Sequence, residues 1–495
     1  MKKFSFLIIV YVFCIVCFSG DFVRILHTND FHGHILPKID KDGVEIGGIA
    51  RIAKKIEHIT SLYPDTLVLD AGDFISGFLY ANFDTGETVV EIYKQIPFTA
   101  IVPGNHEFDY GYENMKKILA PFEDKIVCAN VYSRGKRVYQ PFIIKEVNNL
   151  RVLIMGVTTP EIKRFALGLD EAGVFVSLPQ NEVRKILSQN RDKYDVSILL
   201  SHIGFEEDVK IAQEFSNLDI IIGGHTHTLL KVPPVFNNTI VNQAGAYGER
   251  LGFLRAYYEK VNDKTVMKYY NSDLAIPLKS WGENQVIKNI VDVAEQKVIA
   301  ISSQIVGEAL DVFPAGKKDV RMGETAIGNV ISESLLYLSK ADFAVMNGGG
   351  IRSSLNKGAI SAADVEKVLP FKNNAMVIKV TGKKLIENFG NSLQALKIPK
   401  LSGAFLQVAG IKVEYDLENE KVKLFTSNGK AIEENKEYTF ALNDYMKNGG
   451  DGYLFKECEE IENYVTGKPL KDILTEYIRK MQKISPKKDG RIVIK

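Results

Sequence analysis

Cysteine is scarce in this chain, and neither sign of charge is in excess. Two of the four cysteines, Cys14 and Cys17, lie in an N-terminal apolar run, and Cys128 and Cys458 are far apart in the sequence. This distribution excludes a small fold held together by disulfides. With 62 basic and 61 acidic side chains, the chain lacks the basic surplus that binds nucleic acid polymers or anionic membranes.

Long hydrophobic runs are also missing, except at the N-terminus. Two lysines precede the apolar run from Phe4 to Phe18, and the small residues Ser19 and Gly20 follow it. This layout is typical of a secretory signal peptide over residues 1–20. The alternative is an uncleaved anchor, although a full membrane span needs about 20 apolar residues. We therefore expect a periplasmic or secreted protein with no membrane span after signal cleavage and no disulfides.

The length of 495 residues exceeds what one hydrophobic core usually supports and predicts two domains. In the first part of the chain, short apolar runs predict strands, and patterns such as Gly48 to Leu62 predict helices between them. This alternation predicts a layered α/β domain. The predicted strands end at residues that bind metals or transfer protons: Asp30, His32, Asp73, Asn105, His106, His202, His225 and His227.

These strand ends predict a metal site, because ligands bind α/β sheets where the carboxyl ends of the strands converge. Any one of the motifs alone is more often a helix cap, a turn or a core histidine. Two aspartates, one asparagine and four histidines of this set, all except His106, make seven possible ligands, which are too many for one tetrahedral zinc. Their mixture of carboxylate, amide and imidazole excludes a thiolate site. We expect two divalent metal ions, with Zn²⁺, Mn²⁺ or Co²⁺ favoured because the ligands are not all oxygen.

The motifs DFH, GD, GNHEFD, SH and GGHTH, in this order, resemble the metallophosphoesterase signature of the 5′-nucleotidase family. The resemblance implies a four-layer N-terminal domain, in which a β-sandwich is flanked by helices. It also implies one metal ion held by Asp30, His32, Asp73 and His227 and a second held by Asp73, Asn105, His202 and His225, with Asp73 as the bridge.

The same resemblance gives His106 and Asp109 the role of a catalytic pair, in which His106 meets the phosphate and Asp109 orients its ring. Two metal ions about 3.5 to 4 Å apart activate water and neutralise phosphoryl oxygens. A cationic His106 would stabilise the charge that develops in the transition state. The alternative for Asp109 is a cap on the following helix. His27 and His34 have no such assignment and are expected to support the ligands or to be structural.

We place the metallophosphoesterase domain at residues 21–280, a linker helix at 281–303 and a second α/β domain at 304–495. Within the first domain, the stretch TIVNQAGAYGERLGFLRAYY predicts a hairpin that returns to the core. The segment NQVIKNIVDVAEQKVIA carries apolar residues at helical spacing, which indicates the linker helix.

The second domain contains no histidine, and no metal cluster is predicted there. Glycine-rich turns carry little information when taken singly. Together, however, the motifs VRMGETAIGN, NGGGIR, VLPF and NGGDGY resemble the nucleotide-recognition half of the 5′-nucleotidases. The resemblance implies these substrate contacts: Arg321, Asn347, Arg352, Phe371, Tyr445 and Asp451.

In these roles, Phe371 and Tyr445 would sandwich the base, because every nucleobase offers a π-face. Asp451 would accept hydrogen bonds from ribose hydroxyls. The two arginines would form forked hydrogen bonds with the ribose, the phosphate or a carboxylate. Animal relatives have Phe in place of Tyr445; stacking survives this change, and the added hydroxyl could alter base preference.

We therefore predict a 5′-nucleotidase that hydrolyses nucleoside 5′-monophosphates, such as AMP, to nucleoside and phosphate. One alternative is a relative that cuts nucleotide sugars, dinucleotides or 2′,3′-cyclic nucleotides. Another is a non-catalytic surface protein that keeps the fold to bind partners or metals, although the complete ligand set and catalytic pair argue against it. Nothing in the sequence indicates the oligomeric state.

Overall fold

The computed structural model describes residues 21–76, 80, 83–160, 162, 169, 172–262, 264–371, 373–398 and 403–495. The predicted signal peptide at residues 1–20 lies outside these described residues. The chain divides into two compact units, Met1–Val298 and Ile299–Lys495. In the described part of the chain, no helix has the length and apolarity needed to cross a membrane.

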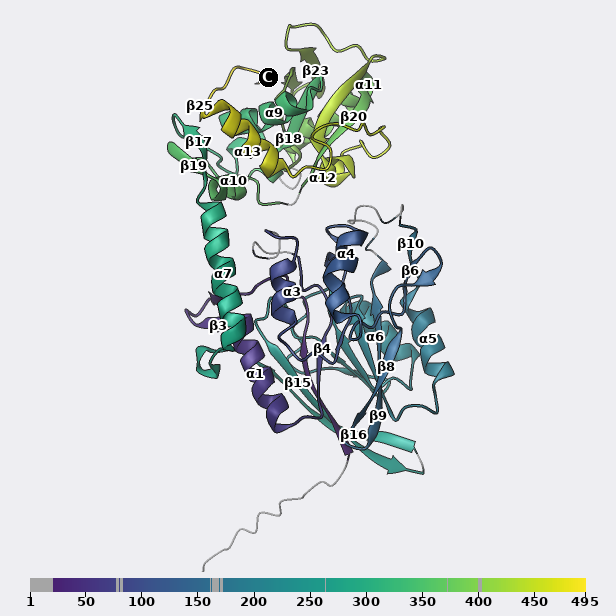
Figure 1. The fold of residues 1–495 in the computed structure, drawn as a ribbon. Coiled ribbons are helices and arrows are strands. Elements are labelled where there is room, and N and C mark those ends of the chain that lie inside the picture. Colours follow the sequence, from purple (N-terminus) through teal and green to yellow (C-terminus); the bar gives the residue numbers. More distant parts are fainter. Residues whose placement is uncertain are drawn as a thin grey trace, which may run out of the picture. The chain divides into compact units, whose positions relative to one another are not determined.

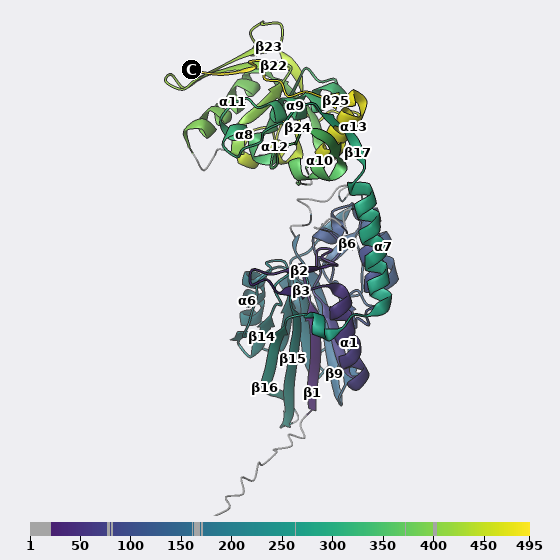
Figure 2. The same ribbon diagram turned by 90° about the vertical axis from the view of Figure 1, so that its left-hand side faces the viewer.

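Two β-sheets pack face to face in the first unit (Figures 1 and 2). The five-stranded sheet has the order β16 (Lys264–Ala275), β15 (Leu251–Val261), β1 (Asp21–Thr28), β4 (Thr66–Asp70) and β5 (Ala100–Ile101). The six-stranded sheet has the order β13 (Val235–Phe236), β14 (Thr239–Asn242), β12 (Ile220–Gly223), β11 (Val196–His202), β9 (Leu150–Thr158) and β8 (Phe142–Val147). Strands β1, β4 and β5 run parallel, and so do β9, β11, β12 and β14.

Helices cover the outer face of each sheet and complete four layers. Helices α1 (Ile49–Leu62), α3 (Glu87–Tyr93) and α4 (Tyr112–Leu119) share a core with the five-stranded sheet. Helices α5 (Pro179–Gln189) and α6 (Phe205–Glu214) share another with the six-stranded sheet. The arrangement arises because alternate side chains of a strand point to opposite faces, and central strands such as β4 and β11 are buried on both faces. It confirms the predicted four-layer α/β domain.

The linker region contains helix α7 (Gln285–Ser302). Its buried residues Ile287, Val291, Ala294 and Val298 recur every three or four positions and join the core beside the five-stranded sheet. The smaller elements of the first unit are β2 (Pro37–Ile39), β3 (Glu45–Gly47), β6 (Val131–Ser133), β7 (Lys136–Arg137), β10 (Val174–Val176), η1 (His106–Phe108), η2 (Ala120–Phe122) and η4 (Lys279–Trp281).

The prediction of a hairpin between residues 239 and 258 is wrong. Strand β14 pairs with β12 and β13 in the six-stranded sheet, whereas β15 pairs with β1 and β16 in the five-stranded sheet. The chain between β14 and β15 therefore crosses from one sheet to the other. On the way it reaches the predicted ligands, because the Tyr247 N–H donates to the Asp30 carbonyl oxygen at 2.8 Å.

A four-stranded sheet forms the centre of the second unit, in the order β20 (Ala375–Thr381), β24 (Glu437–Asn443), β18 (Phe343–Asn347) and β21 (Leu406–Ala409). Helices α9 (Ala326–Ser339), α10 (Ala362–Val368) and α13 (Leu470–Met481) share a core with one face of this sheet. Helix α11 (Gly382–Lys397) packs on the other face. The second unit is thus a mixed α/β domain, as predicted.

Smaller elements complete the second unit. Two three-stranded sheets have the orders β19 (Gly358–Ser361), β17 (Ile305–Ala309), β25 (Lys483–Ile484) and β23 (Lys421–Thr426), β22 (Ile411–Asp416), β26 (Ile492–Ile494). The short helical segments are α8 (Asp319–Met322), η5 (Gly348–Gly350), α12 (Asp444–Lys447) and η7 (Gly450–Gly452).

Candidate metal centre and nucleoside-binding residues

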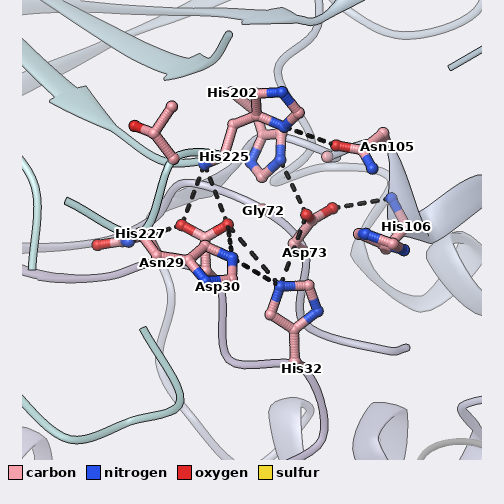
Figure 3. Close-up of polar contacts among 12 residues, drawn as sticks. Asn29, Asp30, His32, Gly72, Asp73, Asn105, His106, His202, His225 and His227 are labelled. Carbon is pink, nitrogen blue, oxygen red and sulfur yellow. Dashed lines mark hydrogen bonds and ion pairs between the residues drawn. The ribbon is translucent and has the colours of Figure 1, made fainter. Parts of the chain in front are cut away.

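The predicted metal ligands come together at the carboxyl ends of strands from both sheets (Figure 3). The loops after β1, β4 and β5 carry the ligands of the five-stranded sheet. The end of β11 and the loop after β12 carry those of the six-stranded sheet. His202 is the last residue of β11. The ligands of the five-stranded sheet are Asp30, His32, Asp73 and Asn105, and those of the six-stranded sheet are His202, His225 and His227.

Three groups of possible ligand atoms lie close together, and two of them consist of predicted ligands alone, around the Asp30 and Asp73 carboxylates. In the first group, Asp30 Oδ1 lies 3.4 Å from His227 Nε2, and His32 Nε2 lies 3.1 Å from the same atom. In the second, Asp73 Oδ2 lies 3.0 Å from His202 Nε2. The same Asp73 oxygen is 3.8 Å from His32 Nε2, which places it between the two groups.

The asparagine also lies in the second group. Asn105 Oδ1 is 2.9 Å from His225 Nδ1, and the His225 backbone N–H donates to the Asp30 carboxylate at 3.0 Å. Close approach of the loops requires glycine at position 104, where an added Cβ would lie 2.1 Å from Asp73 Oδ1. The backbone N–H of Asp30 donates to the Gly72 carbonyl oxygen at 2.9 Å, which ties the first two loops together.

The histidine tautomers fit a bound cation. His32 Nδ1 lies 2.7 Å from the Ser76 carbonyl oxygen, and His202 Nδ1 lies 2.6 Å from the Ala71 carbonyl oxygen. A carbonyl oxygen only accepts, so each Nδ1 carries the proton and leaves Nε2 as the ligand atom. His202 Nε2 is buried and has no hydrogen-bond partner of acceptable geometry in the described structure.

Electrostatics at the cluster favour positive charge. Burial pulls the pKa of His202 down, but the Asp73 carboxylate outweighs it and raises this pKa to about 10. Burial also opposes ionisation of Asp73, yet His202, followed by His106 and His32, holds the pKa of Asp73 well below its usual range. Burial lowers the pKa of His32 and favours its neutral, metal-binding form. A divalent cation would take the place of the His202 proton.

The backbone at this cluster is strained. Five of the predicted ligands have the left-handed conformation, in which non-glycine residues are uncommon: Asp30 (φ 49°), His32 (φ 50°), Asp73 (φ 58°), His225 (φ 76°) and His227 (φ 53°). Conformations of this kind persist where the surrounding structure enforces them, and they gather at functional sites.

The predicted catalytic pair lies beside the ligands. His106 Nδ1 is 2.8 Å from Asp109 Oδ2, an oxygen that also accepts from the Ser76 hydroxyl. Burial would lower the pKa of His106, but the hydrogen bond with Asp109 and the Asp73 charge raise it. Helix α4 begins after Gly111, without a side-chain cap, so Asp109 does not cap this helix and instead contacts the His106 imidazole and the Ser76 hydroxyl. The His106 side chain is 38% exposed, and its contact with Asp109 uses Nδ1 rather than Nε2.

His27 and His34, which the sequence left without a role, differ in their surroundings. His27 is fully buried between the sheets, where its Nε2 is 3.1 Å from the Asn242 side-chain nitrogen, and burial lowers its pKa to about 4. The His34 ring lies 4.4 Å from that of Tyr247, and burial lowers its pKa to about 4 as well. Tyr247 also contacts the ring of His32 at 5.8 Å.

Glu107 is a residue of the site that sequence reasoning missed. Its side chain is fully buried, and its carboxylate accepts backbone N–H groups from Gly104 at 2.6 Å, Asp73 at 2.8 Å, Phe74 at 2.8 Å and Ile75 at 3.2 Å. It therefore fastens the loop that carries Asp73 to the loop that carries Asn105. Burial, followed by the Asp73 charge, raises its pKa to about 7. The available signal was an acidic residue inside the GNHEFD motif.

Replacement of Glu107 by Gln is expected to weaken metal binding about 10- to 100-fold, as changes around metal ligands commonly do. An amide offers one accepting oxygen where the carboxylate offers two, so its NH₂ group must face two backbone N–H donors. Metal affinity is measured by titration of the metal-free protein with Mn²⁺. Asp219→Asn is the matched control, because Asp219 accepts from Ser197 at the opposite end of β12. Equal metal affinities in both variants would contradict this role.

The residues predicted to bind substrate are all in the second unit. Asn347 ends β18, Tyr445 lies in α12 and Asp451 in η7, and the three are joined by hydrogen bonds. The Arg352 guanidinium lies 5.6 Å from the centre of the Phe371 ring, so these two residues form a second contact pair. Arg321 lies on the short helix α8.

This four-layer fold with carboxylates and imidazoles at its strand ends defines a metallophosphoesterase. The calcineurin-like phosphoesterase model matches residues 23–229, and the model of the 5′-nucleotidase C-terminal domain matches residues 300–457. The chain therefore belongs to the 5′-nucleotidase family and is a metal-dependent phosphoester hydrolase.

Individual relatives agree with this assignment. The trifunctional nucleotide phosphoesterase of Bacillus subtilis (strain 168) is 31% identical; the match covers 95% of this chain but only 35% of that longer protein. The 5′-nucleotidase of Rattus norvegicus is 28% identical, with 95% of this chain and 90% of the relative covered. The crystal structure of a 5′-nucleotidase precursor from Thermus thermophilus has a TM-score of 0.64 at 26% identity, with 96% and 99% covered.

Proposed function

We propose that this protein is a 5′-nucleotidase, which hydrolyses nucleoside 5′-monophosphates such as AMP to nucleoside and inorganic phosphate. The observation that carries the proposal is the cluster of seven predicted ligands with the His106–Asp109 pair beside it. Relatives named 5′-nucleotidase that match 95% of this chain support the choice of substrate class.

Two divalent cations fit the two groups of ligand atoms. We assign Asp30, His32, Asp73 and His227 to one cation and Asp73, Asn105, His202 and His225 to the other, with Asp73 shared. When bound, such a pair supplies charge neutralisation and activation of the attacking water. The mixture of imidazole, amide and carboxylate favours Zn²⁺, Mn²⁺ or Co²⁺.

The residues of the chain orient the substrate and stabilise charge. His106, held by Asp109 through Nδ1, would donate from Nε2 to a phosphoryl oxygen or to the leaving oxygen, where negative charge grows as the ester bond breaks. In the second unit, Phe371 and Tyr445 are 48% and 44% exposed. Exposed aromatic rings offer stacking surfaces for a base, and Asp451 offers acceptors for ribose hydroxyls. Arg321 and Arg352 would bind the ribose, the phosphate or a carboxylate.

Other phosphoesters form the second candidate substrate class. The relative from Bacillus subtilis is named a trifunctional nucleotide phosphoesterase, and the same ligand set could act on nucleotide sugars, dinucleotides or 2′,3′-cyclic nucleotides. Residues 1–20 lie outside the described part, and we propose from their sequence that the enzyme acts in the periplasm or outside the cell in nucleotide catabolism.

A substrate panel tests the proposal. Phosphate and nucleoside release are measured with AMP, UMP, a dinucleotide, a nucleotide sugar, 2′,3′-cyclic AMP and an aryl phosphate. We expect kcat/KM to be highest for the 5′-monophosphates and about 10- to 100-fold above the aryl phosphate, because stacking is worth about 1 to 3 kcal/mol per base. Preferential cleavage of the dinucleotide or the cyclic nucleotide would instead select the second candidate.

A further inference from the structure

An open network of hydrogen-bonded polar side chains, here called the polar network, includes the predicted ribose acceptor in the second unit. It connects Asn443, Asn347, Asp451 and Tyr445 through hydrogen bonds of about 3 Å. Two members come from the adjacent strands β24 and β18, and the other two from α12 and η7. Asn443 is not among the predicted site residues, and base stacking does not use the hydroxyl of Tyr445.

The direction of these hydrogen bonds is fixed at Asn443. This residue is fully buried and caps α12, where its Oδ1 accepts the Met446 backbone N–H at 2.8 Å. Its Nδ2 must therefore be the atom that donates to Asn347 Oδ1, at 3.0 Å. Asn347 is left with Nδ2, which donates to Asp451 Oδ2 at 3.0 Å. The buried amides thus present a donor, and not an acceptor, to the carboxylate.

The other oxygen of the carboxylate is held by the aromatic residue. The Tyr445 hydroxyl donates to Asp451 Oδ1 at 3.0 Å. Partial burial and the Asp451 charge raise the pKa of this hydroxyl, so it keeps its proton. The aromatic ring of Tyr445 lies directly against Gly450, where an added Cβ would be 2.4 Å from Tyr445 Cζ. The position of the hydroxyl is therefore set by the turn that also carries Asp451.

A carboxylate held in this way has a defined remaining capacity. Ionised carboxylate oxygens accept about two hydrogen bonds each, and the polar network uses one on each oxygen. One accepting position remains on each of two adjacent oxygens in a fixed orientation. This pattern is complementary to two neighbouring hydroxyl groups on one face of a sugar, as in the 2′,3′-diol of ribose.

We propose that the Tyr445 hydroxyl and Asn443 make the enzyme selective for ribonucleotides over 2′-deoxyribonucleotides, by fixing the Asp451 carboxylate for a cis-diol. The inference rests on the proposed 5′-nucleotidase function. The Tyr445 hydroxyl determines specificity through Asp451, and Asn443 is a positioning residue. The stacking of the base by the Tyr445 ring is a separate contribution, which phenylalanine at this position retains.

The experiment compares AMP with 2′-deoxy-AMP in the full-length, metal-loaded enzyme. We expect the native enzyme to favour AMP about 10- to 100-fold in kcat/KM, as for one hydrogen bond to a charged group. Tyr445→Phe removes one oxygen atom and should reduce this ratio about 3- to 10-fold, the effect of losing one orienting hydrogen bond. Phe371→Ala is the matched control, because it weakens stacking of both nucleotides and leaves the ratio unchanged.

Asn443→Asp tests the other end of the polar network. The new carboxylate still accepts from Met446 but offers no donor to Asn347, so the AMP to 2′-deoxy-AMP ratio should fall as in Tyr445→Phe. Titration with adenosine and 2′-deoxyadenosine by calorimetry gives the same comparison without turnover. Circular dichroism spectra and melting temperatures that match those of the native enzyme show that each variant is folded.

The outcomes separate this inference from the function on which it rests. A native enzyme that cleaves nucleotides but does not distinguish AMP from 2′-deoxy-AMP would overturn the inference alone, and so would a Tyr445→Phe variant with the native ratio. Cleavage of aryl phosphate without any preference for nucleotides would instead reject the proposed function, and the inference with it.

Discussion

Removal of divalent metal ions by a chelator is expected to lower phosphate release more than about 1,000-fold, because the attacking water then loses its activation. The folded protein should survive, since the Asp73 carboxylate retains His202 as an ion-pair partner at 3.0 Å. Circular dichroism before and after chelation checks this point. Re-addition of Mn²⁺, Co²⁺ or Zn²⁺ should restore activity, whereas Mg²⁺, which prefers oxygen ligands, should restore less.

The same chelator, already saturated with metal, serves as the control for non-specific effects. Metal analysis of the active protein should give two equivalents if both groups of ligand atoms are filled. Native turnover by protein shown to be free of metal would rule out the metal centre. One equivalent of metal at full activity would contradict only the second cation and the bridging role proposed for Asp73.

Replacement of His106 by Asn is expected to lower kcat about 100- to 1,000-fold, the usual loss when one donor to a developing negative charge is removed. Substrate KM should change little, because the contact strengthens mainly in the transition state. His58→Asn is the matched control, since His58 is an exposed histidine on α1. A near-native kcat in His106→Asn would assign this residue a structural role.

The metal content of the His106→Asn variant shows whether His106 acts on the phosphate or binds a cation. His106 lies with His32 and Asp73 in a third group whose ligand atoms are all within 4.8 Å of one another, so geometry alone would allow it to bind a cation. If His106 acts on the phosphate, the variant keeps its metal while turnover falls. Loss of metal together with turnover would make His106 a ligand and leave Asp109 as its orienting partner.

Local sequence signals were sufficient to predict which side chains meet at the strand ends, but not the groups that hold them in place. Each ligand follows a short apolar run, and parallel strands bring such ends together whatever the pairing order. Glu107 gave no periodic signal, because its four donors are backbone N–H groups of two loops that meet only after folding. The polar network is equally non-local, since Asn347 and Asn443 are 96 positions apart.

The hairpin between residues 239 and 258 was wrongly predicted for a related reason. Alternating apolar residues indicate a strand and its buried face, but they carry no information about the partner. Strand β15 has β1 on one side, more than 200 positions earlier in the chain. The first half of the predicted hairpin stays in the other sheet, so the crossing could only be seen in the structure.

If the five predicted ligands with a left-handed backbone bind metal, stability and activity place opposite demands on these positions. Each such residue costs about 1 to 3 kcal/mol, so five of them cost at least about 5 kcal/mol, a large share of the 5 to 15 kcal/mol by which domains are usually stable. Glycine would relieve this cost at every one of these positions and remove a ligand each time. Selection for thermal stability alone would therefore erode the metal centre first, and variants chosen for robustness should be screened for metal retention from the start.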